Sequence, residues 1–230
     1  MLEVMAEMKV LAASDIHGYY AVYSWLVQKA REKRVDFLLL AGDLLGCPRG
    51  YETVQDAQRH DAATIVGILR GIEVPIYYIM GNDDLVELDP CSCQFTAIHS
   101  RRVELPDGNL VGYQYSPPFI GGIHEKPEEE IRADLAQLAG LVDRGTILVT
   151  HSPAHGVLDV GLLDLHAGSQ AILDLVRSRD VRAHIHGHMH YWFGRVGRHF
   201  NVASGGKPRA MIIDLESLAS TVEQDTADGA

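Results

Sequence analysis

KVLAASDIHG (residues 9–18) begins as an apolar run and ends in a polar turn. A short apolar run bounded by turn residues is typical of a buried β-strand, so a strand is predicted over Lys9–Ala13. The next segment, residues 20–34, has apolar side chains at helical spacing. Together these segments predict a strand followed by a helix, with Asp15 and His17 in the turn between them.

The same pattern of apolar runs followed by polar turn residues continues along the chain. Phe37–Ala41 is entirely apolar and is followed by Gly42-Asp43, and residues 75–80 are followed by Gly81-Asn82. Helix 169–179 is expected to begin at Ser169, whose hydroxyl can accept a hydrogen bond from an unpaired amide of the first turn. Further strands are expected at residues 110–115, 147–150, 183–185, 199–203 and 210–215, and further helices at residues 53–69 and 127–142.

The order of these elements predicts the fold class. Alternating strands and helices indicate an α/β fold with parallel pairing. Strands 199–203 and 210–215 have no long helix between them, so an antiparallel pair is predicted, and the sheet or sheets should be mixed. In α/β folds ligands bind beyond the carboxyl ends of the strands, which is where the Asp, Asn and His residues of interest fall.

Length and composition indicate one domain. The chain has 230 residues, of which 47% are hydrophobic, enough for one sizeable core. No repeat or linker marks a boundary, so a single domain is expected over residues 1–216. Residues 217–230 are polar and are expected to fray as a C-terminal tail.

The charge balance limits the partners. A net charge of −11 and a pI near 5.5 disfavour tight binding to nucleic acid or to an anionic membrane. Glu3 and Glu7 stand where a secretory signal would be basic, and no apolar run approaches about 18 residues, so a cytoplasmic protein without a membrane span is expected. Three cysteines do not suit a disulfide framework, and Cys91-Ser92-Cys93 is interpreted as a loop feature.

Seven oxygen or nitrogen donors follow predicted strands. Two carboxylates, one amide and four imidazoles do not suit a four-ligand, Cys-rich structural zinc site, but they suit a pair of cations that clamp a phosphoryl group. Side chains at i and i+2 of an extended segment point the same way, so the paired donors can approach one cluster. The donors lie in Asp15-x-His17, Gly42-Asp43, Gly81-Asn82, Thr150-His151 and Gly187-His188-Met189-His190.

This ordered set of motifs resembles the calcineurin-like metallophosphoesterases, and the resemblance covers about residues 9–215. Residues 150–190 are similar to the small stand-alone phosphodiesterases of that family. The resemblance implies two packed mixed β-sheets flanked by helices, and two divalent metal ions drawn from manganese, iron, zinc and nickel. It implies that one metal binds Asp15, His17 and His190, that the other binds Asn82, His151 and His188, and that Asp43 bridges them.

One position departs from the family pattern. The family commonly has a His directly after the Gly-Asn asparagine, where it contacts phosphate and can protonate the leaving group, whereas this chain has Asp83. A carboxylate beside a phosphate is repulsive when ionised, and it donates a proton only if its pKa is raised. Poor leaving groups should therefore be hydrolysed slowly.

The expected function is metal-dependent hydrolysis of small-molecule phosphodiesters or activated phosphomonoesters by a metal-bridging hydroxide. The catalytic residues expected from the resemblance are Asn82, Asp83, His151 and His188. A nuclease of the same superfamily and a non-catalytic interaction scaffold on the same fold are the alternatives. A basic groove would favour the nuclease, whereas the complete donor set disfavours the scaffold.

The remaining histidines are expected to have structural roles. His184 and His186 alternate with Ile185 in a strand and are expected to pack or to support the ligands. Loop residues His124 and His155 can reach the cleft, but exposed positions are favoured. Surface or hydrogen-bonded positions without a metal are expected for His60, His99, His166 and His199.

Overall fold

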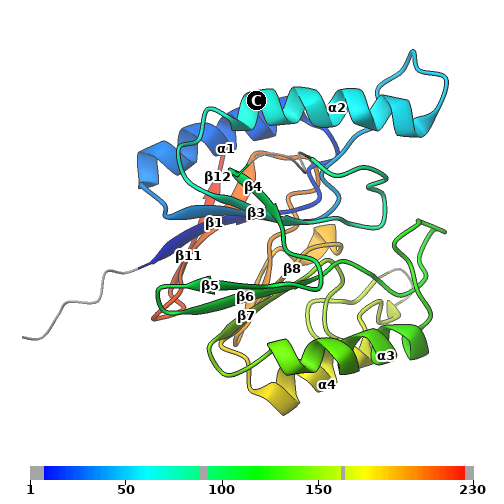
Figure 1. Ribbon diagram of the computed structural model, residues 1–230, viewed down its shortest axis with the longest axis vertical. Coiled ribbons are helices and arrows are strands. Elements are labelled where there is room, and N and C mark those ends of the chain that lie inside the picture. Colours follow the sequence, from blue (N-terminus) through cyan, green and yellow to red (C-terminus); the bar gives the residue numbers. More distant parts are fainter. Residues whose placement is uncertain (1–7, 89–92, 162–163, 226–230) are drawn as a thin grey trace, which may run out of the picture.

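A computed structural model of the chain describes residues 8–88, 93–161 and 164–225. Two six-stranded β-sheets pack face to face (Figure 1). Helices α1 (Tyr20–Lys33) and α2 (Val54–Leu69) cover one sheet, and α3 (Glu128–Leu138) and α4 (Gln170–Arg179) cover the other. This arrangement confirms the predicted α/β fold of two packed mixed sheets flanked by helices.

The first sheet is mixed. Its strands β1 to β4 are parallel, β11 runs antiparallel to β1, and β12 runs antiparallel to β11. The order across the sheet is β12 (Ser220–Gln224), β11 (Arg209–Asp214), β1 (Lys9–Ala13), β2 (Phe37–Ala41), β3 (Ile76–Ile79) and β4 (Phe95–Ala97).

The second sheet has a parallel centre and antiparallel edges. Two short 3₁₀ helices, η1 (Ala139–Leu141) and η3 (His190–Trp192), follow α3 and β8. The order across the sheet is β5 (Arg102–Leu105), β6 (Gly108–Tyr113), β7 (Thr146–Thr150), β8 (Ala183–His186), β10 (His199–Asn201) and β9 (Gly194–Val196).

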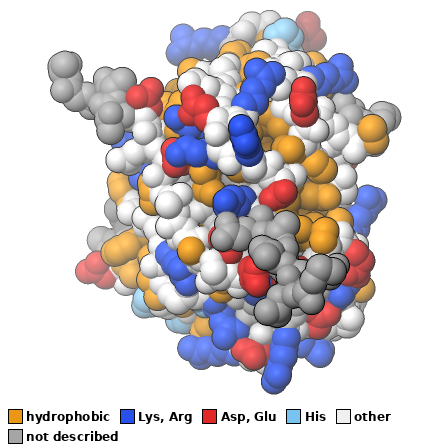
Figure 2. All heavy atoms as spheres, turned by 90° about the vertical axis from the view of Figure 1, so that its left-hand side faces the viewer, with side chains coloured by type: hydrophobic (Ala, Val, Ile, Leu, Met, Phe, Trp, Pro, Cys, Tyr) orange, Lys and Arg blue, Asp and Glu red, His pale blue; other side chains and the backbone are white. Residues whose placement is uncertain are grey.

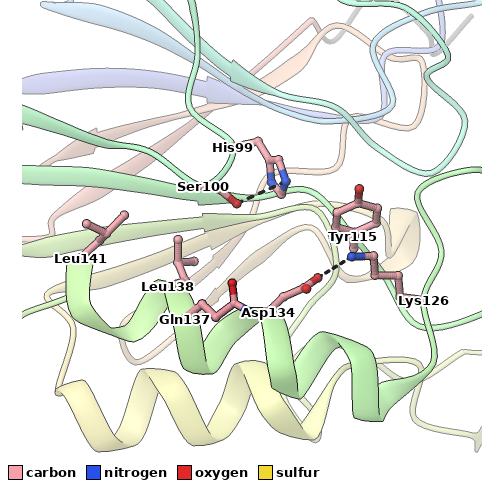
Figure 3. A pocket seen from close by; sticks show the side chains of 8 residues that line it. All are labelled: His99, Ser100, Tyr115, Lys126, Asp134, Gln137, Leu138 and Leu141. Carbon is pink, nitrogen blue, oxygen red and sulfur yellow. Dashed lines mark hydrogen bonds and ion pairs between the residues drawn. The ribbon is translucent and has the colours of Figure 1, made fainter.

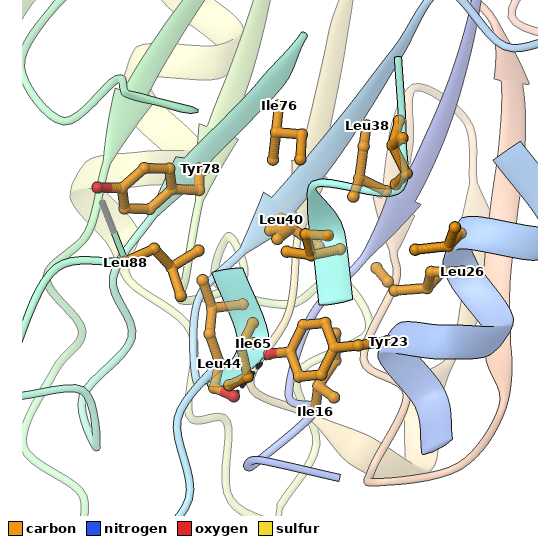
Figure 4. Packing of buried hydrophobic residues seen from close by; sticks show 14 of the residues in the cluster. Ile16, Tyr23, Leu26, Leu38, Leu40, Leu44, Ile65, Ile76, Tyr78 and Leu88 are labelled. Carbon is orange, nitrogen blue, oxygen red and sulfur yellow. Dashed lines mark hydrogen bonds between the residues drawn. The ribbon is translucent and has the colours of Figure 1, made fainter. Parts of the chain in front are cut away.

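Both faces of β2, a central strand of the first sheet, are buried, which explains why this strand is apolar throughout. Leu38 and Leu40 of β2 pack against the helices, where Leu26 of α1 belongs to the same buried cluster (Figure 4). Leu39, which points the other way, lies in the cluster between the two sheets. Because side chains alternate along a strand and each buried leucine stabilises the fold by roughly 1.5–3 kcal/mol, a polar substitution at any of these positions would be costly.

The predicted start of α4 is confirmed. Ser169 has an extended backbone, and its side chain accepts a hydrogen bond from the amide of Ile172 at 3.2 Å. The expected strands over Lys9–Ala13 and Phe37–Ala41 have these bounds in the structure, and the expected helix at 20–34 is α1.

The predicted antiparallel pair of late strands is wrong. Strand β10 pairs parallel with β8 in the second sheet, whereas β11 pairs with β1 in the first. The chain crosses between the sheets after Asn201, and Ser14 at the end of β1 holds the crossing by accepting from the amide of Ser204 at 2.8 Å. The connection from β10 to β11 is short and contains no helix, yet it joins two different sheets. The length of a connection therefore does not show whether the strands that it joins are neighbours in one sheet.

The predicted fraying from residue 217 is also wrong for residues 220–224, which form β12. Five register pairs join β12 to β11, from Arg209 with Gln224 to Ile213 with Ser220. The strand lies at the sheet edge with its side chains largely exposed, so its polar composition suits a strand as well as a tail. The predictions for Glu3, Glu7, Cys91, Ser92 and residues 226–230 lie outside the described residues.

Every helix within the described ranges is too short or too polar to span a lipid bilayer.

Candidate metal centre

The predicted donors lie at one edge of the two sheets. Asp15 follows β1 and Asp43 follows β2 in the first sheet, while His151 follows β7 and His188 comes shortly after β8 in the second. A hydrogen bond joins the ends of strands from the two sheets, because the amide of His188 donates to the Asp15 carboxylate at 2.9 Å. Carboxylates from one sheet and imidazoles from the other therefore meet in one place.

Sharp turns, rather than extended backbone, aim these side chains. Four of the donors have a left-handed backbone: Asp15 (φ 54°), His17 (φ 50°), Asp43 (φ 51°) and His188 (φ 70°). The assumption that paired donors sit in extended segments is therefore wrong. Non-glycine residues rarely adopt this conformation because the Cβ atom crowds the backbone, and such strain is concentrated at functional sites.

Two glycines permit the close approach of backbone to donors. Gly42 has φ 92°, and a Cβ atom there would lie 2.5 Å from Nδ1 of His151. A Cβ atom on Gly187 would overlap the carboxylate of Asp15 and the side chain of Ser14. A larger residue at either position would displace a predicted ligand.

The first group of converging ligand atoms comes from Asp15, His17 and His190, whose atoms lie within 4.8 Å of one another. Nε2 of His190 lies 3.1 Å from the Asp15 carboxylate and 3.4 Å from Nε2 of His17. Burial raises the pKa of Asp15, but the neighbouring histidines hold it below its usual value overall. Three donors around one point can hold a cation.

The second group comes from Asp43, His151 and His188, and a third comes from His17, Asp43 and Asp83. Asp43 thus belongs to two groups. The side-chain oxygen of Asn82 lies 3.0 Å from Nε2 of His151, so Asn82 borders the second group. The seven donors predicted as ligands are therefore brought together, while their role as ligands remains a prediction.

The geometry of His151 fits a cation. Its Nδ1 lies 2.9 Å from the carbonyl oxygen of Ala41, which can only accept, so Nδ1 carries a proton. Its Nε2 then faces two more oxygens, from Asn82 and from Asp43 at 3.4 Å. A neutral imidazole would direct a lone pair at these oxygens, whereas a cation would be bound by all three atoms.

When no cation is bound, a proton on Nε2 of His151 allows this atom to donate to the oxygens of Asn82 and Asp43. Burial lowers the pKa of His151, but Asp43 and Asp15 raise it to about 10. Burial raises the pKa of Asp43, but His151, the amide of Asp83 and His17 together lower it by more, so the carboxylate stays ionised. The buried His151 ring therefore carries positive charge at the position where a metal would supply it.

Supporting residues orient the donors. The Asp15 carboxylate accepts from the Ser14 hydroxyl at 2.6 Å and from the amide of His188 at 2.9 Å. Buried Asn201 donates to the carbonyl of Met189 at 2.8 Å and so fixes the turn between His188 and His190. The sequence did not lead us to Ser14 and Asn201 as supporting residues. Ser14 follows directly after an apolar run and Asn201 lies within a predicted strand, and these positions are the signal that could have identified them.

Asp83 lies at the exposed side of the centre. Its carboxylate is 3.9 Å from Nδ1 of His17, and its amide donates to Asp43 at 3.0 Å. Burial, followed by the charge of Asp43, raises its pKa above the usual value. Asp84 is a separate case, because its buried carboxylate accepts from the amides of Leu44, Leu45 and Gly81 and so organises two of the turns.

A family model described as calcineurin-like phosphoesterase matches residues 8–192, which is most of the chain. The protein belongs to the calcineurin-like phosphoesterase family. This family needs divalent metal ions, and the His and Asp clusters are groups that could hold them. No curated protein sequence is significantly similar to this chain.

Solved structures with the same fold are distant in sequence. One crystal structure superposes with a TM-score of 0.75 and 18% identity, covering 95% of this chain and 99% of its own. The protein TT1561 of Thermus thermophilus has a TM-score of 0.66 and 17% identity, covering 95% and 99%. A dimetal phosphatase from Danio rerio has a TM-score of 0.59 and 12% identity, covering 94% and 98%. At these identities the likeness supports the fold of this calcineurin-like phosphoesterase.

The other histidines of this phosphoesterase lie mostly as predicted. His184 and His186 are buried and stacked, with ring centroids 5.0 Å apart, and His184 contacts Thr150 and His199. His155 contacts His166 rather than the donor groups. His124 is half-buried, contrary to the predicted exposed position, and its Nδ1 donates to the carbonyl of Gly81 at 2.9 Å.

A separate cavity of about 320 Å³ lies beside α3 (Figure 3). Lys126 pairs there with Asp134 at 2.6 Å and lies 3.9 Å above the ring of Tyr115. Burial lowers the pKa of His99, which also lines the cavity, to about 4. None of its eight lining residues belongs to a donor group, so the chemistry is expected at the strand ends instead.

Proposed function

We propose that the protein is a two-metal phosphoesterase that hydrolyses phosphodiesters or activated phosphomonoesters. The observation that carries this proposal is the sharing of Asp43 between two groups of ligand atoms. One of these groups contains His151 and His188, and the other contains His17, which also belongs to the Asp15 group. A carboxylate in that position is suited to bridge two cations.

The chain's own residues prepare the site for the reaction. The Ala41 carbonyl fixes the ring of His151, and the amide of Asp83 fixes the Asp43 carboxylate, so neither donor needs to reorganise. The amide nitrogen of Asn82, which donates to Asp83 at 3.0 Å, offers a neutral donor to a phosphate oxygen. When bound, the two cations would supply an activated water and neutralise the phosphate charge. Manganese, iron, zinc and nickel all suit this mixture of imidazole and carboxylate.

The substrate preference follows from the leaving group. Asp83 occupies the position where the family commonly has a proton-donating His, and its carboxylate lies next to Asp43. Departure of an alkoxide needs a proton, whereas departure of an aryloxide does not. We therefore expect diesters and monoesters with an aryl leaving group to react faster than alkyl esters.

The nuclease alternative is less well supported. The net charge of −11 opposes binding to a polyanion. On the side of the molecule where the chain enters β1, turned away from the metal centre, Lys and Arg side chains are scattered among Asp and Glu side chains (Figure 2). Hydrolysis of single-stranded DNA at a rate comparable to that of a small diester would favour the nuclease.

The scaffold alternative conflicts with the donor set. A protein that only binds a partner has no need for ionised carboxylates at buried Asp15 and Asp43, because buried charge is costly unless it is paired. Tightly bound metal without turnover of any ester would favour the scaffold.

The test is hydrolysis of bis-p-nitrophenyl phosphate by the purified full chain before and after chelation. Activity should disappear with chelation and return when manganese, zinc, iron or nickel is added. A matched assay with p-nitrophenyl phosphate measures the preference for diesters. Full activity in protein shown to be metal-free would overturn the proposal.

A further inference from the structure

One loop beside the metal centre carries an exposed apolar patch. Phe119 is 60% exposed, Ile120 66% and Ile123 57%. Single exposed apolar side chains are common, but three within five residues form a patch, which usually marks a binding surface. Residues 117–123, with the sequence PPFIGGI, carry no charged side chain.

The patch adjoins the predicted ligands. The ring of Phe119 makes an edge-to-face contact with the ring of His188, with centroids 4.9 Å apart and an interplanar angle of 73°. Gly122 lies so close to the carbonyl oxygen of Asn82 that a Cβ atom would overlap it. The loop therefore borders the group of donors formed by Asp43, His151 and His188.

Hydrogen bonds hold the loop with its apolar side chains outward. The Glu125 carboxylate accepts from the amides of Phe119 at 2.8 Å, Ile120 at 3.0 Å and Gly121 at 2.9 Å. Burial raises the pKa of Glu125, but these amides lower it below its usual value overall. The patch is thus a preorganised surface, which binds a ligand without first having to be ordered.

Aromatic side chains also lie close to His190 of the Asp15 group. Tyr19 is 58% exposed and packs against Gly206, and Tyr191, directly after His190, is 95% exposed. The organic group nearest His188 would contact Phe119 rather than charged side chains.

We infer that Phe119 and Ile120 form a subsite that selects diesters with an apolar, ring-sized group on the oxygen that stays with phosphorus. This inference rests on the proposed function, because it names the substrate class of the same site. Edge-to-face contact with a second ring and burial of its apolar surface both favour an aromatic group over a methyl group. The reaction is unchanged: water forms a new bond to phosphorus, and the bond to the leaving oxygen breaks.

The experiment holds the leaving group constant. p-Nitrophenyl phenyl phosphate and p-nitrophenyl methyl phosphate both release p-nitrophenolate and leave phenyl or methyl phosphate. The ratio of their kcat/KM values, corrected by the ratio of their uncatalysed rates, should favour the phenyl ester. Phe119→Ala should lower this ratio by about fivefold, Ile120→Ser should lower it by less, and Phe119→Tyr should retain it.

Val222→Ala is the matched control, because Val222 is 51% exposed and lies on β12, outside the donor groups. It should leave the ratio unchanged. An unchanged ratio in Phe119→Ala protein that still hydrolyses the methyl ester would overturn the inference but not the proposed function. Loss of self-association in Phe119→Ala with an unchanged ratio would assign the patch to a contact between copies of the chain, and it would also overturn the inference. Absence of metal-dependent hydrolysis of either ester by the unaltered protein would overturn the proposed function itself.

Discussion

The two halves of the metal centre differ in their access to solvent. In the group of Asp15, His17 and His190, the histidine side chains are 27% and 42% exposed. In the group of Asp43, His151 and His188, the side chains of His151 and Asp43 are only 0% and 5% exposed. We therefore expect the closed group to bind metal tightly and to contribute to stability, and the open group to exchange metal and admit substrate.

Asp43→Asn should have the largest effect, because it alters both halves at once. The loss of a shared anionic donor is expected to weaken both metal sites and to lower kcat/KM for a p-nitrophenyl diester by on the order of 10³-fold or more. Metal content and activity are measured on the same sample. Asp174→Asn, at a half-exposed carboxylate on α4, is the control and should change neither. Two tightly bound metals in Asp43→Asn would show that Asp43 does not bridge.

Replacing one histidine in each half separates the two groups. His151→Ala leaves the buried Asp43 unpaired, so metal-free protein should lose about 3 kcal/mol of unfolding free energy. His190→Ala removes an imidazole that is 42% exposed and leaves the Asp15 carboxylate its bonds from the Ser14 hydroxyl and the His188 amide, so it should cost less than His151→Ala. Urea unfolding in chelator gives both values. Equal losses would contradict the difference between a closed and an open half.

The same two variants should differ in how fast they lose metal. Each is expected to retain one metal, but the metal in His190→Ala should be lost more slowly to a competing chelator, because the closed group remains intact. The opposite order of loss would mean that exposure does not govern metal exchange here.

Asp83→His should change selectivity more than overall rate. The unaltered protein should hydrolyse p-nitrophenyl diesters much faster than alkyl esters, and an imidazole at this half-exposed position can supply the proton that an alkoxide needs. The variant should therefore narrow the ratio of the two rates at matched metal content. An unchanged ratio with both metals bound would show that residue 83 is not in the proton donor's position.

The sequence predicted the elements better than it predicted their connections. Strands at Lys9–Ala13 and Phe37–Ala41 were found because both of their faces are buried, which makes them uniformly apolar. The partner of residues 199–201 depends on where the chain crosses between sheets, and nothing local to those residues encodes that crossing. Strand β12 was missed because an exposed edge strand has the same polar composition as a tail.

The donors were identified more readily than their geometry. Asp15, Asp43 and His151 stand directly after apolar strands, so their placement at one edge followed from the α/β pattern. The left-handed backbone of Asp15 depends on long-range contacts, such as the bond from its amide to the carbonyl of Gly42. Phe119 was not singled out, since a loop without periodicity gives no signal for what lies beside it.

The smallest expected effect lies outside the centre, in the pair His184 and His199. Burial, followed by nearby positive charge, lowers the pKa of His199 to about 4, and burial lowers that of His184 as well. The unfolded chain therefore binds more protons between about pH 6.5 and 4, so this contribution to stability is complete above pH 6.5 and declines as the pH falls. His199→Gln should reduce the slope of unfolding free energy against pH over that range. The reduction should correspond to the uptake of about one proton at most on unfolding. The measurement is urea unfolding of metal-free protein from pH 7 to 5, and an unchanged slope would mean that His199 titrates normally in the fold.

Metal titration of the chelated protein tests the central claim most directly. Activity on bis-p-nitrophenyl phosphate and bound metal are followed together as one divalent cation is added in steps. The proposed mechanism predicts saturation at two metals per chain, with most of the activity appearing as the second metal binds to the open group. Saturation of activity at one metal per chain, or full activity before any metal is added, would contradict a two-metal phosphoesterase.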